Sequence, residues 1–91
     1  MRDQTKRPAT EKQKRALKER IDKGVELCVA TLARAGMPLT TYGIADEMNL
    51  PEGAARNIIA HCVARGRVKK YDEIYIREGR HLRRFNLYTV A

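Results

Sequence analysis

The sequence contains no long run of apolar residues. Hydrophobic residues make up 43% of its 91 positions, but polar and charged residues interrupt them throughout. A membrane-spanning helix needs about 20 consecutive apolar residues, and a secretory signal peptide needs a shorter apolar block near its start. Neither pattern is present, and the segment from Met1 to Arg15 is polar and basic. We therefore expect a single small cytoplasmic domain with no membrane segment.

Cysteine is scarce, and Cys28 and Cys62 are the only two. Together with two histidines at scattered positions, they make no zinc-binding signature. Both cysteines fall among apolar residues with helical spacing, which favours reduced thiols in the core of a cytosolic protein. A disulfide between them has no support in the spacing but stays open.

The sequence also lacks the motifs of known catalytic sites. It has no nucleophile elbow, phosphate-binding loop, metal pair or coupled carboxylates, and His61 and His81 have no acidic partner at a useful spacing. We therefore expect no enzyme activity, no metal, no cofactor and no small-molecule ligand.

Positive charge is abundant. Lys and Arg total 19 against 11 Asp and Glu, which gives a net charge of +8 and a pI near 9.9. Such a surface attracts polyanions and is typical of nucleic-acid binding. A basic surface that only aids solubility or associates with ribosomes is the alternative.

The chain is predicted to begin with a flexible basic arm over residues 1–9, followed by one domain over residues 10–91. Thr10 and Gln13 have the spacing of a capping box at the start of a first helix. The helix should bury one apolar stripe and end where Gly36 and Pro38 stop it. The stripe consists of Leu17, Ile21, Val25, Cys28, Val29 and Leu32.

Two shorter helices are predicted next. One starts at Thr40 or Thr41 and runs to about Met48, and Asn49 suits the left-handed turn that follows it. Pro51 fits the start of the other, which should span roughly 52–65 and end at Gly66. Their expected buried residues are Ile44, Ala45, Met48, Ala55, Ile58, Ile59 and Cys62, with Val63 at the edge.

The last part of the chain changes to β-forming residues on either side of a turn at 77–80, where Gly79 permits positive φ. This pattern predicts a β-hairpin, and Pro38-Leu39 can add a short third strand. The hairpin register stays open, because Leu82 and Phe85 have opposite parity and a bulge can intervene.

The segment from 40 to 68 resembles the helix-turn-helix of winged-helix bacterial and phage transcriptional regulators, of which the MarR-like and GntR-like families are examples. The matching residues are Thr40, Ile44-Ala45, Met48-Asn49-Leu50-Pro51, Ala55, Ile59, Cys62, Gly66 and Val68. The fold implied is α+β, a winged helix-turn-helix with a three-helix core and a C-terminal β-hairpin wing.

In this geometry the outer face of the third helix enters the major groove of DNA. The recognition residues expected there are Glu52, Gly53, Arg56, Asn57 and His61, beside Ala60. Arg56 can read guanine and Asn57 can read adenine, each through two hydrogen bonds. Simple solvation of these polar side chains is the alternative interpretation.

Three further groups of residues are expected to contact DNA. At the start of the second helix they are Thr40 and Thr41. Around the wing tip they are Arg77, Arg80, His81, Arg83 and Arg84, although charges on an edge strand also block aggregation. Phosphate contacts are expected from Arg65, Arg67, Lys69 and Lys70, or these are solvated charges.

The function predicted from the sequence is specific binding of double-stranded DNA by a nucleoid-associated regulator, with repression favoured over activation. A homodimer through the first helix is expected to bind a pseudo-palindromic site. Two alternatives stay open, because fold alone does not fix function. They are an adaptor that binds an acidic protein and a non-specific architectural nucleic-acid binder.

Overall fold

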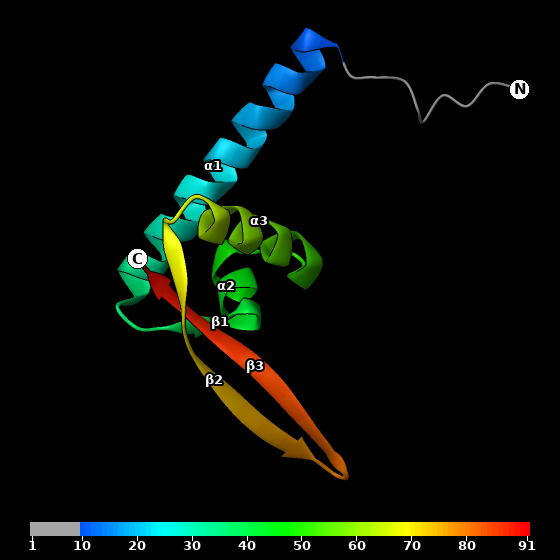
Figure 1. The fold of residues 1–91 in the computed structure, drawn as a ribbon, viewed down its shortest axis with the longest axis vertical. Coiled ribbons are helices and arrows are strands. Elements are labelled where there is room, and N and C mark those ends of the chain that lie inside the picture. The colour runs from blue at the N-terminus through cyan, green and yellow to red at the C-terminus, as the bar shows by residue number, and fades with distance from the viewer. Residues whose placement is uncertain (1–9) are drawn as a thin grey trace, which may run out of the picture.

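In the computed structural model, residues 10–91 are described, and the predicted basic arm over residues 1–9 lies outside them. The chain forms three helices and a three-stranded antiparallel sheet, in the order α1, β1, α2, α3, β2, β3 (Figure 1). The α+β class predicted from the sequence is confirmed, and the layout is compatible with a winged helix.

Helix α1 spans Glu11–Ala35 and has the predicted caps. The Thr10 hydroxyl accepts a hydrogen bond from the backbone N–H of Gln13 at 3.1 Å, and the Gln13 side chain accepts one from the Thr10 N–H at 2.9 Å. These bonds satisfy two donors that would otherwise lack partners at the helix start. Gly36 ends the helix in the left-handed conformation, with φ of 67°.

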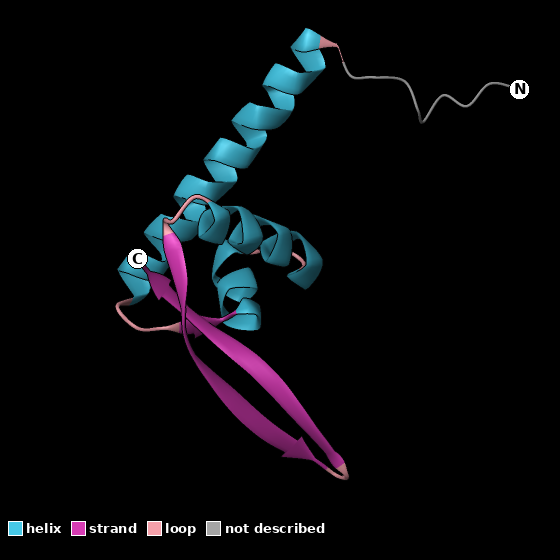
Figure 2. Ribbon diagram, in the orientation of Figure 1, coloured by secondary structure: helices cyan, strands magenta, loops and turns pink. Residues whose placement is uncertain are grey.

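The predicted apolar stripe of α1 is correct only in its C-terminal half. Val25, Cys28 and Leu32 are buried, but all of residues 11–20 are exposed, and Leu17 is 51% exposed. The N-terminal half of α1 projects beyond α3 (Figure 2). The prediction for Leu17 was wrong because helical spacing shows which residues share a face, but not where the covering element ends.

Helices α2 (Thr41–Met48) and α3 (Glu52–Ala64) are joined by three residues. Asn49 adopts the predicted left-handed conformation, with φ of 57°, and the Leu50 N–H donates to the Ala45 carbonyl at 2.9 Å. This short connection sets α3 at an angle across α2 (Figure 1). Arg65 caps α3, one residue earlier than the end predicted from the sequence.

The core lies where the three helices meet the root of the hairpin. Its buried residues are Val25, Cys28, Leu32, Ile44, Ile59, Cys62 and Val68. Gly24 lets α1 and α3 approach closely, because a Cβ atom at this position would lie 3.2 Å from Ile58 Cδ1. The position of α3 therefore depends on the absence of a side chain at Gly24.

The sheet consists of β1 (Leu39–Thr40), β2 (Val68–Glu78) and β3 (His81–Val90), with β3 in the middle. The predicted short third strand is present and pairs Leu39 with Tyr88. The hairpin register pairs Ile74 with Phe85, and a register shift interrupts β2 between residues 70 and 72. Leu82 is exposed and Phe85 is half-buried, as expected for two residues on opposite faces of the same strand.

Both cysteines are free and fully buried, as predicted. The Cys62 thiol donates to the Val25 carbonyl at 3.8 Å, so it links α3 to α1. Burial raises the pKa of Cys28 to about 12 and also raises the pKa of Cys62. The core therefore holds two neutral thiols.

These thiols predict a loss of stability at high pH. A group whose pKa is raised by folding contributes stability below its unfolded pKa, and this contribution falls as the pH rises. Above the ordinary thiol value of 9.0, Cys28 should lower the free energy of unfolding by about 1.4 kcal/mol per pH unit, and Cys62 should add to this slope. Urea denaturation from pH 8 to 11 measures the slope. The double variant Cys28→Ala/Cys62→Ala should lose this part of the slope, and an unchanged slope would contradict the assignment.

Candidate functional site

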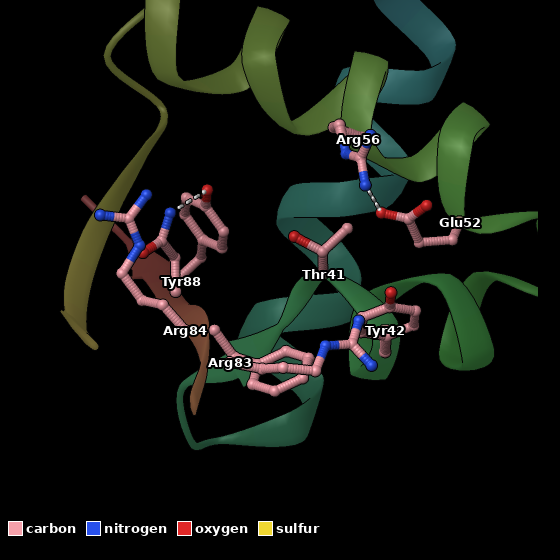
Figure 3. Close-up of a pocket in the computed structure, with 9 residues that line it drawn as sticks. Thr41, Tyr42, Glu52, Arg56, Arg83, Arg84 and Tyr88 are labelled. Carbon is pink, nitrogen blue, oxygen red and sulfur yellow. Dashed lines mark hydrogen bonds and ion pairs between the residues drawn. The ribbon is translucent and has the colours of Figure 1, made fainter. Parts of the chain in front are cut away.

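A polar concavity lies between the N-terminal ends of α2 and α3 and the strand β3 (Figure 3). Thr41 and Tyr42 of α2 and Glu52 and Arg56 of α3 form one side. The other side belongs to β3, which contributes Arg83, Arg84, Phe85, Asn86 and Tyr88. Residues far apart in the sequence thus form one common, partly cationic surface.

Helix α3 presents the face expected from the sequence. Ala55, Ile59 and Cys62 are buried, whereas Gly53, Arg56, Asn57, Ala60 and His61 are exposed and Glu52 is half-buried. Of the predicted recognition residues, Glu52 and Arg56 line the concavity. Asn57 lies next to Arg56 on the exposed surface of the helix, and His61 lies one turn further along.

Arg56 forms an ion pair with Glu52 one turn earlier on α3, and this pair is drawn in Figure 3. An acidic residue in the first turn also interacts favourably with the positive end of the helix dipole. The Arg56 side chain stays 66% exposed. The pair therefore directs Arg56 along the rim of the concavity and leaves most of its side chain open to solvent.

The β3 side of the concavity is held against α2 by aromatic contacts. The rings of Tyr42 and Phe85 meet edge to face at 5.8 Å, and the Arg83 guanidinium lies 5.2 Å from the centre of the Phe85 ring. Arg83 also donates to the Glu78 carboxylate at 3.2 Å, and this hydrogen bond raises the pKa of Arg83. Arg83 is therefore fixed in place by the hairpin, and Phe85 joins the hairpin to α2.

Next to it, Arg84 forms no ion pair with any residue in the described range 10–91. The Asn86 side chain donates to the Tyr88 hydroxyl at 3.4 Å, while its buried carbonyl oxygen has no hydrogen-bond partner among the same residues. The concavity thus contains the charged donor Arg84 and, in the Asn86 carbonyl oxygen, an acceptor without a hydrogen-bond partner among these residues.

An apolar groove adjoins the concavity and shares Thr41, Arg56 and Tyr88 with it. The groove runs between α3 and the root of the hairpin, and its remaining lining residues are Ile59, Ala60, Val63, Ala64 and Lys70. Val63, predicted at the edge of the buried stripe, is 46% exposed.

The four predicted phosphate-binding cations lie apart from the concavity. Arg65 pairs with Asp22, and Arg67 pairs with Glu26, each at 2.7 Å. Both of these partners lie on α1, so the two arginines tie the end of α3 and the start of β2 to the first helix. Lys70 pairs with Glu73 within β2. Lys69 borders a separate surface that includes Met37 and Tyr71.

The cations at the hairpin tip are exposed. Arg77, Arg80 and His81 flank the turn at Gly79, which has φ of 61°. The tip extends away from the helices (Figure 1), so these three side chains do not share the concavity.

Thr40, which was expected to contact DNA at the start of the second helix, caps α2 by accepting a hydrogen bond from the Gly43 N–H at 3.1 Å.

Several residues of this surface were not predicted from the sequence as site residues. They are Tyr42, Phe85, Asn86, Tyr88 and Val63. Their role depends on tertiary contacts across the sheet, for which a local pattern gives no signal.

Among residues 10–91, no three side chains of His, Cys, Asp or Glu lie close enough together to hold a metal ion. No helix in that part of the chain combines the length and apolarity that crossing a membrane requires.

Comparisons of the chain with protein-family models, curated proteins and solved structures find no match.

The ion pairs predict which arginines support the fold. Hydrogen bonds from Arg67 hold the pKa of the Glu26 carboxyl below its ordinary value of 4.5. Arg67→Gln should therefore lower the melting temperature at neutral pH. The loss should shrink in 1 M salt, where exposed charges are screened to about 3 Å. It should also shrink as the pH falls below 4.5 and Glu26 becomes protonated.

Arg84→Gln is the matched control, because it removes an equal charge that has no ionic partner among residues 10–91. Its melting temperature should equal that of the wild type at both salt concentrations. Equal losses in the two variants would show that the Arg67–Glu26 pair does not stabilise the fold.

Proposed function

We propose that this chain is a winged helix-turn-helix domain that binds a specific site on duplex DNA. Helix α3 enters the major groove, and the β2–β3 hairpin is the wing. The observation that carries the proposal is the shared concavity, in which Arg56 of α3 and Arg84 of β3 line one surface. A helix and a cationic hairpin side by side offer base contacts and phosphate contacts at once.

Base recognition is assigned to Arg56 and Asn57. Both are exposed near the N-terminal end of α3, the part of a recognition helix that meets base edges. Arginine pairs with the N7 and O6 atoms of guanine, and asparagine pairs with the N6 and N7 atoms of adenine. The Glu52 carboxylate orients Arg56 before binding, which reduces the conformational entropy that Arg56 loses on the DNA.

Phosphate contacts are assigned to the hairpin. Arg84 borders the concavity, and Arg77, Arg80 and His81 surround the exposed tip. Such a tip fits the DNA backbone or a narrow minor groove, where the negative potential favours arginine. Arg65 and Arg67 are assigned to the fold instead, because their ion pairs tie them to α1 and neither lines the concavity.

The biological role that follows is control of transcription. A domain seated on a specific site excludes other proteins from the same DNA, so repression is the simplest consequence. A homodimer on a pseudo-palindromic site remains part of the proposal. The exposed face of α1 that carries Leu17 is the surface proposed for the second copy.

A protein-binding adaptor is the second candidate, and one observation favours it. Ile74, Ile76 and Leu82 of the hairpin are 37%, 47% and 58% exposed. DNA backbone contacts make little use of such apolar side chains, whereas a protein partner would bury them. The two candidates differ in whether the charged or the apolar side chains of the hairpin control binding.

The DNA-binding proposal predicts two different kinds of mutational defect. On the tightest-binding duplex recovered from a random pool, Arg56→Ala or Asn57→Ala should cost about 1–3 kcal/mol, with little effect on random DNA. Arg84→Ala should weaken binding to both DNAs and reduce the slope of log affinity against log salt by about one. The wild-type slope should lie near −4 to −5, for about four to six neutralised phosphates. Fluorescence anisotropy over a salt series measures all of these quantities.

Arg34→Ala is the charge-matched control, since Arg34 lies in the last turn of α1, away from the concavity. It should bind both DNAs as the wild type does. A salt-independent affinity, or equal small effects from all four variants in folded protein, would contradict the proposal and support the adaptor.

A further inference from the structure

The apolar groove beside α3 is not explained by the packing of the fold. Ile59 forms part of its lining and is buried, but Ala60, Val63 and Ala64 are exposed along one side of the helix. Tyr88 of β3 lies on the opposite side. These side chains present a continuous apolar surface to solvent, next to the polar concavity that holds Arg56.

The charges around the groove indicate the chemistry of its occupant. Arg56 and Lys70 line it together with the apolar residues. Each pairs with a carboxylate of its own element, but their side chains stay 66% and 45% exposed and can contact an anion. Arg84 stands on the neighbouring part of β3. An apolar surface bordered by cations fits a polyanion that carries small apolar groups, rather than an apolar ligand alone.

Duplex DNA has this combination of properties. Its backbone is anionic, and the 5-methyl group of thymine is the apolar group that base pairs display in the major groove. Alanine and other apolar side chains of recognition helices recognise thymine through that methyl group. Ala60 and Val63 lie one and two turns after Arg56, on the same side of α3.

We infer that the groove formed by Ala60, Val63 and Tyr88 receives the 5-methyl group of a thymine adjacent to the base contacted by Arg56. This inference rests on the proposed DNA-binding function and adds a specificity to it. The binding site then contains a T·A pair beside the Arg56 contact. Burying one methyl group accounts for a factor of about four in affinity.

Replacing thymine by deoxyuridine tests the groove directly, because it removes the methyl group and leaves the base pairing unchanged. Each thymine of the duplex selected from the random pool is replaced singly, and the affinity is measured by fluorescence anisotropy. We expect a loss of about three- to fivefold at one position or two neighbouring positions, for one buried methyl group. The other positions should be unaffected.

Two variants assign the effect to the groove. Val63→Thr keeps nearly the same shape and adds a hydroxyl group at an exposed position, so the fold should tolerate it. In this variant, the ratio of the affinity for the thymine duplex to the affinity for the deoxyuridine duplex should be less than about half the ratio in the wild type. Ile76→Thr also introduces a hydroxyl group at an exposed β-branched residue, but on the hairpin. This variant should keep the full wild-type loss of affinity when thymine is replaced by deoxyuridine.

The outcomes separate this inference from the function on which it rests. Failure to bind any selected duplex overturns the DNA-binding proposal, and the groove assignment falls with it. Tight DNA binding without a deoxyuridine effect at any position overturns the groove assignment alone. An unchanged deoxyuridine loss in Val63→Thr also overturns it, because the thymine methyl group is then contacted elsewhere.

Discussion

The packing of α3 against α1 determines which side chains this domain presents to a partner. Gly24 permits the two helices to approach closely, with Ile58 directly over it, and the Cys62 thiol reaches the Val25 carbonyl across the same contact. A rotation of α3 about its axis would place Arg56 and Asn57 elsewhere and would bury or expose the wrong residues. The contact at Gly24 therefore helps to set the direction of the candidate binding face.

The hairpin is anchored in the same core, and its contacts with β1 and α2 place it at the site. Val68 anchors β2 in the core, and the pairing of β1 with β3 brings β3 beside the start of α2. The contact between Tyr42 and Phe85 then fixes the part of β3 that carries Arg84. The cations consequently divide into two groups. Arg65 and Arg67 hold the fold together through α1, whereas Arg56 and Arg84 face the concavity.

Local features of the fold were predictable from the sequence because short-range chemistry controls them. The capping box at Thr10 and Gln13, the left-handed Asn49 and the hairpin turn at Gly79 were all predicted correctly. The exposure of Arg56 and Asn57 also followed from helical spacing. Tertiary features were not predictable in this way. The exposure of Leu17, the ion pairs of Arg65 and Arg67 with α1, the register shift in β2 and the apolar groove all depend on how separate elements meet.

One continuous face, built from the start of α2, the exposed side of α3 and the β2–β3 hairpin, is the surface proposed to bind duplex DNA. Mapping backbone amide chemical shifts by NMR during titration with the selected duplex tests it most directly. Saturable changes are expected at residues 41–42, 52–64 and 77–88, with little change in the last turn of α1 around Arg34. Changes confined to the surface around Met37 and Tyr71, or no saturable change at all, would contradict it.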